Sequence, residues 1–227
     1  MYDFHCHTTH SDGDLIPAEL IRRAEHAGWH GIGMSDHCDF SNVETLIAAI
    51  VAAVRAERRG KGFPVAAGVE ITHVRPAQIG ELVQRVRELG AEYVIVHGES
   101  PVEPVLEGTN RAAIEAGCDI LAHPGEISPA DAQLAAERGV LLEISGRQGH
   151  SLGNGHVARA AHDAGAEVLF GSDTHEPDNI GGPVWGRSVL GLSGLTPDEV
   201  DRAVERSAAF MKKILTRNRK EPVRADG

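Results

Sequence analysis

The sequence predicts an α/β fold in which parallel strands form a (β/α)7 barrel. Strand and helix patterns alternate along the chain, which is typical of parallel strands with helices outside them. No GxGxxG follows the first strand and no GxxxxGK[ST] occurs, so open nucleotide-binding sheets lose support. Metal-ligating residue types follow nearly every strand, and parallel barrels gather their strand ends at one face. We therefore expect a barrel with a metal site at its C-terminal face.

Short apolar runs recur along the chain and are predicted as strands. Such runs, bounded by glycine, proline or charged residues, are typical of strands that are buried on both faces. The predicted strands are Tyr2–His5, Gly31–Ser35, Pro64–Glu70, Glu92–His97, Asp119–Ala122, Val140–Ile144 and Glu167–Gly171.

Helices are predicted between these strands, because start and stop signals flank the intervening segments. Pro17, Ser128 and Thr196 are typical of helix starts. Glycine closes a helix readily, since it has no Cβ and adopts left-handed backbone, and glycine ends most of these segments. The predicted helices are Ala18–Ala27, Val43–Arg58, Ala77–Leu89, Thr109–Ala116, Pro129–Arg138, His156–Ala164 and Pro197–Leu215.

Length and composition indicate one globular domain over residues 1–227, with a core of residues 2–211 and a basic C-terminal tail of residues 212–227. No apolar run is long enough to span a membrane, and the N-terminus lacks the pattern of a signal peptide. Three widely spaced cysteines favour a reducing, cytoplasmic location. The net charge of −11 argues against a broad electrostatic grip on nucleic acid.

The chain has 13 histidines, and several fall where predicted strands end. Because side chains two apart on a strand share a face, His5 and His7 can reach one cation while Cys6 points away. The candidate ligands at the strand ends are His5, His7, Asp12, His37, Glu70, His97, His123, Asp173 and His175.

These ligand types indicate the metal. Imidazole and carboxylate without cysteine pairs suit zinc, manganese or iron better than a closed structural zinc site. The candidates are too many for one ion, so two or three divalent ions are expected. Glu70 or Asp173 is the expected bridge, since adjacent dications need negative charge between them.

Taken in order, the motifs HxH, SDG, DH, GVE, VHG, AHPG and GSDTH resemble the PHP (polymerase and histidinol phosphatase) family. The resemblance runs from about Tyr2 to Gly182 and implies a distorted TIM-like barrel of seven parallel strands. It also implies a trinuclear metal site. The implied ligands are His5, His7, Glu70 and Asp173 for the first ion, Glu70, His97 and His123 for the second, and Asp12, His37 and His175 for the third.

The expected activity is metal-dependent hydrolysis of a phosphoester, above all a small phosphomonoester similar to histidinol phosphate. Three dications would outweigh the carboxylates of Asp12, Glu70 and Asp173, which leaves positive charge for a phosphate dianion. We expect in-line attack by a metal-bound hydroxide. Catalytic roles are expected for Glu70, Asp173, His175 and Arg147.

Residues outside the ligand set are candidates for contact with the substrate. Arg147 follows the sixth strand, and its planar guanidinium suits a phosphate. His73, Arg75 and His150 are further substrate candidates. Glu143 ends the sixth strand and is expected to orient a histidine rather than to bind metal.

Other functions stay open. A phosphodiesterase or nuclease could act on nucleotides or oligonucleotides, although the 4% aromatic content argues against a stacking groove. A barrel hydrolase of the amidohydrolase kind also begins with HxH, but no predicted strand here ends in lysine. A non-enzymatic scaffold similar to the ribonuclease P subunit would not need the full ligand set. The expected partner is a small phosphorylated substrate rather than extended nucleic acid or a membrane; the oligomeric state is not predicted.

Overall fold

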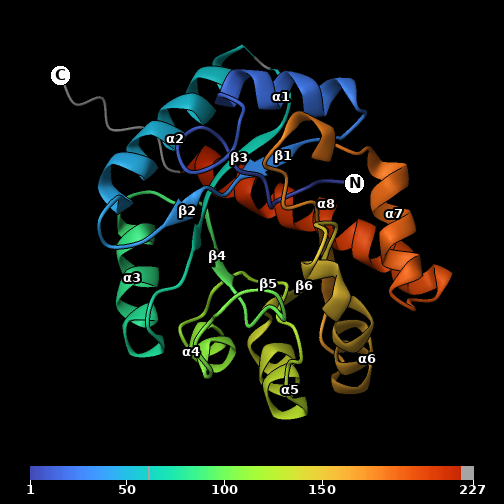
Figure 1. Ribbon diagram of the computed structural model, residues 1–227. Coiled ribbons are helices and arrows are strands. Elements are labelled where there is room, and N and C mark those ends of the chain that lie inside the picture. Colours follow the sequence, from blue (N-terminus) through green and yellow to red (C-terminus); the bar gives the residue numbers. More distant parts are fainter. Residues whose placement is uncertain (61, 221–227) are drawn as a thin grey trace.

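The computed structural model describes residues 1–60 and 62–220, and its parallel strands curl into a distorted barrel (Figure 1). The strand order is β1-β3-β4-β5-β6-β7, and β2 pairs with β3. The predicted α/β barrel is therefore confirmed. The strands are β1 Ile32–Met34, β2 His37–Cys38, β3 Val65–Ile71, β4 Tyr93–His97, β5 Ile120–Ala122, β6 Leu141–Ser145 and β7 Val168–Gly171.

The predicted strand Tyr2–His5 is wrong as a strand, although the segment lies where a strand would close the barrel. It forms only isolated bridges, from Asp3 to Ile32 on one side and from Cys6 to Thr174 on the other. Because the segment changes partners within a few residues, neither side extends into a ladder. The additional strand is the two-residue β2, which is too short to give a sequence pattern.

Alternation along the strands separates the barrel interior from the layer under the helices. In β3, Val65 and Val69 pack outward with the main core, while Ala66 joins the inner cluster. In β4, Tyr93 and Ile95 belong to the same inner cluster. Both inner rows become polar toward the carboxyl end, because the last inward positions are Glu70 in β3, after Gly68, and His97 in β4. The strands thus bury apolar side chains at one end of the barrel and deliver polar ones to the other.

Helices surround the strands, and α8 crosses behind them (Figure 1). In α8, Phe210, Met211 and Ile214 pack with Phe4 in the inner cluster, so this helix closes the amino-terminal end of the barrel. The helices are α1 Pro17–His26, α2 Val43–Arg59, α3 Pro76–Glu88, α4 Thr109–Glu115, α5 Pro129–Arg138, α6 Asn154–Ala164, α7 Pro183–Leu192 and α8 Pro197–Lys220, with 3-10 turns η1 His150–Gly153 and η2 Pro177–Asn179.

Two helix predictions need correction. Helix α7 was not predicted, because its internal glycines Gly186 and Gly191 lower helix propensity and hide its pattern. Helix α8 continues past the predicted end at Leu215, so residues 212–220 of the predicted tail are helical. Residues 221–227 of that tail lie outside the described residues. None of the described helices is long and apolar enough to cross a membrane.

Candidate metal centre

The N-terminal segment places His5 and His7 at the carboxyl end of the barrel. The amide of His7 donates to the carbonyl of Thr174 at 2.8 Å, and the amide of Thr174 donates to the carbonyl of His5 at 3.3 Å. Between the two histidines, Cys6 packs into the main apolar core. The alternation predicted for this segment is confirmed, although the segment is not a regular strand.

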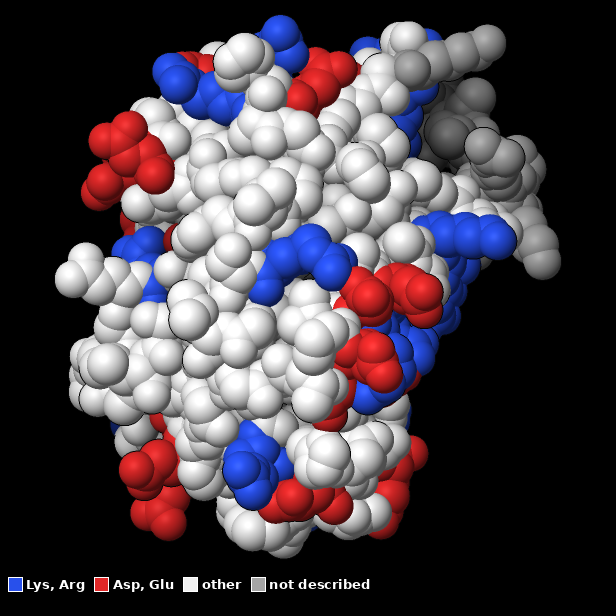
Figure 2. Space-filling view, turned by 90° about the vertical axis from the view of Figure 1, so that its right-hand side faces the viewer, with Lys and Arg blue, Asp and Glu red and all other residues white. Residues whose placement is uncertain are grey.

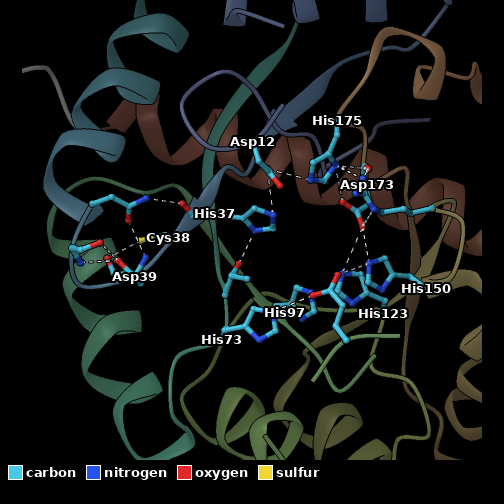
Figure 3. Close-up of a pocket in the computed structure, with 15 residues that line it drawn as sticks. Asp12, His37, Cys38, Asp39, His73, His97, His123, His150, Asp173 and His175 are labelled. Carbon is cyan, nitrogen blue, oxygen red and sulfur yellow. Dashed lines mark hydrogen bonds and ion pairs between the residues drawn. The ribbon is translucent and has the colours of Figure 1, made fainter. Parts of the chain in front are cut away.

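A cavity of about 430 Å³ opens at this end of the barrel (Figure 3). Asp173 lies between a group around Asp12 and a group around His123. Cys38 and Asp39 lie on the side away from Asp173. The lining residues are Asp12, His37, Cys38, Asp39, Ser41, Asn42, Thr72, His73, His97, Glu103, His123, Arg147, His150, Asp173 and His175.

Two buried carboxylates form the middle of the site. The Nε2 atom of His5 lies 3.3 Å from Glu70 Oε1, and Nε2 of His7 lies 3.4 Å from Asp173 Oδ1. The Nε2 atom of His123 approaches both carboxylates, at 3.6 Å from Glu70 and 3.8 Å from Asp173. The structure therefore brings the residues predicted for the first ion together around Glu70 and Asp173.

A second group lies on the Asp12 side. The Oδ1 atom of Asp12 lies 3.2 Å from Nε2 of His175 and 3.4 Å from Nε2 of His37. These three residues and His7 offer ligand atoms within 4.8 Å of one another. The predicted third set is thus assembled, with His7 beside it.

Another group lies around His123, on the other side of Asp173 from Asp12. It contains residues that the sequence did not predict as metal ligands. His97, His123 and His150 offer ligand atoms within 4.8 Å of one another. His150 was expected only as a substrate contact. Glu103, which is not among the predicted site residues, also lines the cavity beside His97. No strand end or motif marks Glu103 in the sequence, because it lies in the loop between β4 and α4.

Unpaired buried atoms show that this donor set suits cations. Nε2 of His5, both ring nitrogens of His7, Oε1 of Glu70 and Nδ1 of His123 are buried without a hydrogen-bond partner among the described residues. Buried polar atoms are normally paired, and leaving one unpaired costs about 1–3 kcal/mol. Several such atoms facing each other around carboxylates are typical of metal ligands. The residues therefore fit the divalent ions that the sequence predicts.

The electrostatics of the site also favour bound cations. Burial opposes ionisation of Glu70 and Asp173, but the His5 imidazole holds the pKa of both carboxyl groups well below their ordinary values. Burial also lowers the pKa of His37, yet the nearby Glu70 carboxylate raises it to about 10. Burial lowers the pKa of His7 to about 4. The carboxylates thus create a field that favours positive charge between them.

Residues behind the ligands fix their orientation. Nδ1 of His5 lies 2.6 Å from Oε1 of Glu143, and the other oxygen of Glu143 accepts the amide of His123 at 3.0 Å. These contacts place Glu143 behind His5, where the sequence prediction that it orients a histidine requires it to be, and the role itself stays a prediction. Asp36 accepts the amide of Thr8 at 2.7 Å and the hydroxyl of Ser11 at 2.8 Å, which holds the loop that leads to Asp12.

Three of the four predicted substrate contacts line the cavity, and Arg75 does not. Nη1 of Arg147 donates to the carbonyl of Asp173 at 3.1 Å and also contacts His175, so the guanidinium lies in the cavity wall. His73 and His150 line the cavity as well. The prediction that Arg75 contacts the substrate finds no support, because this side chain is exposed at the start of α3 and does not line the cavity.

Backbone strain concentrates in the same place. His73, His123 and Asp173 have φ values of 54°, 27° and 53° and are the non-glycine residues with positive φ among those described. Such conformations cost about 1–3 kcal/mol each and persist only where the surroundings impose them, often at functional sites. All three residues line the cavity.

Sequence comparison identifies relatives of several kinds. The PHP domain family profile matches residues 3–106. The uncharacterized protein MJ1295 of Methanocaldococcus jannaschii is 41% identical over 218 residues, which cover 95% of this chain and 99% of that protein. Ribonuclease P protein component 3 of Methanosarcina acetivorans is 27% identical over 237 residues, which cover 97% of this chain and 91% of that protein. The 5'-3' exoribonuclease Rnm of Escherichia coli is 28% identical over 173 residues, which cover 73% of this chain and 49% of that protein.

Solved structures share the fold. A chain of archaeal ribonuclease P with mature tRNA superposes with a TM-score of 0.72 at 19% identity, covering 100% of this chain and 96% of that chain. The putative histidinol phosphatase HisK of Listeria monocytogenes superposes with a TM-score of 0.58 at 11% identity, covering 80% of this chain and 97% of that chain. At these identities the likeness concerns the fold. Relatives named for RNA run against the expectation that extended nucleic acid is not a partner.

Proposed function

The chain belongs to the PHP domain family, and from this premise we propose that it is a metal-dependent phosphoesterase. The observation that carries the proposal is the set of buried imidazole nitrogens of His5, His7 and His123 and the Glu70 oxygen that have no hydrogen-bond partner among the described residues. They lie next to Asp173, which lines the cavity. The preferred substrate is a small phosphomonoester. Attack on phosphorus needs charge compensation and exclusion of bulk water, and a buried site suits both.

The residues that would hold the ions are those that the sequence predicts. Glu70 and Asp173 lie between the histidine groups and are the candidate bridges, while Asp12 serves the outer group with His37 and His175. Bound divalent ions supply Lewis-acid stabilisation of phosphate oxygens and lower the pKa of a coordinated water toward ~7. Zinc, manganese and iron all accept such ligands.

Arg147 is the candidate phosphate contact from the protein itself. Its Nη1 atom is occupied by the Asp173 carbonyl, and the Nε atom lies 3.8 Å from Oδ2 of Asp173. The side chain is still 35% exposed, so part of the planar fork faces the cavity and can donate to a phosphate oxygen. Held in this way, the guanidinium would position the phosphate without taking part in proton transfer.

The size of the cavity favours a small substrate. A volume of about 430 Å³ is in the range of small-molecule sites. Asp39 lines it on the side away from Asp173 (Figure 3), and the lining residues Ser41 and Asn42 are hydrogen-bonded to Asp39, so polar groups are available to the leaving group of the ester. A small anion would enter the carboxylate-lined mouth once cations invert its local charge.

A second candidate is action on the end of an RNA chain, and the names of the relatives favour it. A terminal phosphate or nucleotide could enter the same cavity. The face beside α7 shows acidic and basic groups interspersed among uncharged residues rather than a continuous basic tract (Figure 2). That face therefore offers no electrostatic path for a long polyanion among the residues described. A scaffold in an RNA–protein assembly, without hydrolysis, is the remaining alternative.

A substrate panel tests the proposal. Purified protein loaded with zinc, manganese or iron is assayed on an aryl phosphomonoester, an aryl phosphodiester and a 5'-phosphorylated oligoribonucleotide. We expect hydrolysis of the monoester to be fastest and to disappear in His123→Ala. The matched control is His26→Ala, which removes an exposed histidine of α1 and leaves the rate unchanged.

The other outcomes discriminate the alternatives. Stepwise release of nucleotides from the oligoribonucleotide, with no monoester turnover, would establish the second candidate instead. RNA binding without hydrolysis of any substrate, under every metal tested, would overturn the enzymatic proposal in favour of a scaffold.

A further inference from the structure

We propose that Glu103 and His150 are metal ligands of this chain, in addition to the residues that the sequence and the family resemblance predict. They extend the His97–His123 side of the centre. The inference rests on the metal dependence of the proposed function, but it concerns which side chains bind the cation and not which ester is hydrolysed.

Three imidazoles converge on the carboxylate of Glu103. Its Oε2 atom lies 3.1 Å from Nε2 of His73 and 3.2 Å from Nε2 of His97. Its Oε1 atom lies 3.3 Å from Nε2 of His150. Ligand atoms bound to one cation at about 2.0–2.2 Å lie roughly 3–3.5 Å apart, so these separations match a shared coordination shell.

The remote ring nitrogen of His97 is hydrogen-bonded in the way that orients a metal-binding histidine. Nδ1 of His97 contacts the carbonyl of Gly98 at 3.0 Å, and a carbonyl oxygen only accepts, so Nδ1 carries the proton. In the neutral imidazole the lone pair of Nε2 then faces a carboxylate oxygen of Glu103. The 3.2 Å between this nitrogen and the Glu103 oxygen is a separation that two ligands of one cation also have.

His150 is oriented in the same way as His97, by a hydrogen bond on Nδ1. It is 4% exposed, and its Nδ1 lies 2.5 Å from the hydroxyl of Ser100, which leaves Nε2 turned toward Glu103 and the centre. Its ring stacks on that of His123, with centroids 4.1 Å apart. A hydrogen bond on the remote ring nitrogen is the usual way of orienting a metal-binding histidine.

The backbone brings these two residues together from separate loops. Gly149, immediately before His150, has φ of 91°, and a Cβ there would approach Val102 to 3.2 Å. Gly125 has φ of 57°, and a Cβ there would collide with the carbonyl of Glu99. Glycine at these positions lets the β4–α4 loop lie this close to η1 on one side and to the loop after β5 on the other. The positive φ of His73 adds strain at the third contact of Glu103.

Binding of metal alone tests the inference without any ester. Metal-stripped wild-type protein, Glu103→Gln and His150→Gln are titrated with Mn²⁺ and Zn²⁺ in competition with a chelator. Loss of a ligand should weaken one class of bound ion at least tenfold in each variant. The matched controls are Glu107→Gln, an exposed carboxylate of the same loop, and His156→Gln, a histidine outside the cavity that contacts the carbonyl of Ile127. Both controls should bind metal as the wild type does.

Hydrogen exchange gives a second readout that does not depend on affinity. If Glu103 binds the cation, metal should slow amide exchange in residues 98–108 of the wild type but not of Glu103→Gln. The inference would be overturned if both ligand variants bound metal as tightly as the wild type and if metal slowed exchange in residues 98–108 equally in the wild type and in Glu103→Gln. Metal binding that depends on Glu103 in a protein without phosphoesterase activity would support this inference and defeat the proposed function, so the two failures are distinguishable.

Discussion

The Nδ1 atom of His5 lies 2.6 Å from the Glu143 carboxylate, while Nε2 of the same ring is buried without a hydrogen-bond partner among the described residues. Glu143 is completely buried, and a Cβ on Gly171 would collide with its Oε1 atom. Glycine at position 171, the end of β7, therefore leaves the space that the Glu143 carboxylate of β6 occupies. This pair turns the free nitrogen of His5 toward Glu70 and Asp173.

Replacing Glu143 with glutamine should weaken metal binding about 10–100-fold, the usual effect of losing an orienting partner behind a ligand. The amide retains the shape and one acceptor, but it no longer makes the His5 imidazole more basic. Chelator competition measures the affinity, and Glu126→Gln, an exposed carboxylate, is the control. An affinity within twofold of the wild type would show that Glu143 does not orient the ligand.

Removal of the Arg147 guanidinium should lower kcat/KM for a phosphoester about 10²–10³-fold, as for other charge-stabilising donors. Metal content is measured in the same preparations, because Arg147 also contacts His175 and a lost phosphate contact must be separated from lost ions. Arg147→Lys should recover only part of the rate, because an ammonium lacks the planar fork. Arg75→Ala, outside the cavity, is the control. Equal rates for Arg147→Ala and Arg75→Ala would remove Arg147 from the site.

Gly68 in β3 should tolerate no side chain, because a Cβ there would collide with the phenol of Tyr93 inside the barrel. That hydroxyl donates to the carbonyl of Phe4 at 2.8 Å, so the ring cannot move freely. Gly68→Ala should lower the free energy of unfolding by about 1–3 kcal/mol in urea denaturation. Gly80→Ala, in helix α3 with nothing within 4 Å of the added Cβ, should instead raise it by about 0.5–1 kcal/mol. A neutral effect of Gly68→Ala would contradict the packing described here.

Metal removal should destabilise the fold. A cation at 100 times its dissociation constant stabilises the native state by about 2.7 kcal/mol, which corresponds to roughly 5–10 °C in Tm for a chain of this size. Differential scanning calorimetry before and after chelation measures the shift, and returning the metal should reverse it. Glu70→Gln should show a much smaller shift, because it removes a carboxylate from the middle of the site. Equal shifts in both proteins would place the stabilising metal elsewhere.

Most of the fold was predictable because it depends on local patterns. The runs at Val65–Ile71 and Tyr93–His97 are apolar on both faces, and a parallel barrel requires this. The N-terminal segment Tyr2–His5 is short and ends in a histidine as Tyr93–His97 does, which predicts a strand, but its pairing depends on two distant partners, Ile32 and Thr174. The sequence does not show that each of these partners forms only one bridge with the segment, too few for a regular strand.

The residues of the candidate site also fall into those that the sequence predicts and those that it does not. Residues that end a strand or follow it, such as His97 and His123, could be placed by the topology of a parallel barrel. Glu103 could not, because it lies several residues into a proline-flanked loop whose path is set by contacts with Gly125 and Gly149. His150 was placed near the substrate and not near the metal, since its approach to His97 and His123 depends on the same loop packing.

The central claim, a metal centre that hydrolyses phosphoesters, is tested most directly by titrating metal-stripped protein with Mn²⁺ while measuring hydrolysis of an aryl phosphate. The rate should be absent without metal, rise as ions bind, and level off only beyond one equivalent per chain. Turnover in the stripped protein, or none in protein shown to bind several ions, would contradict the account.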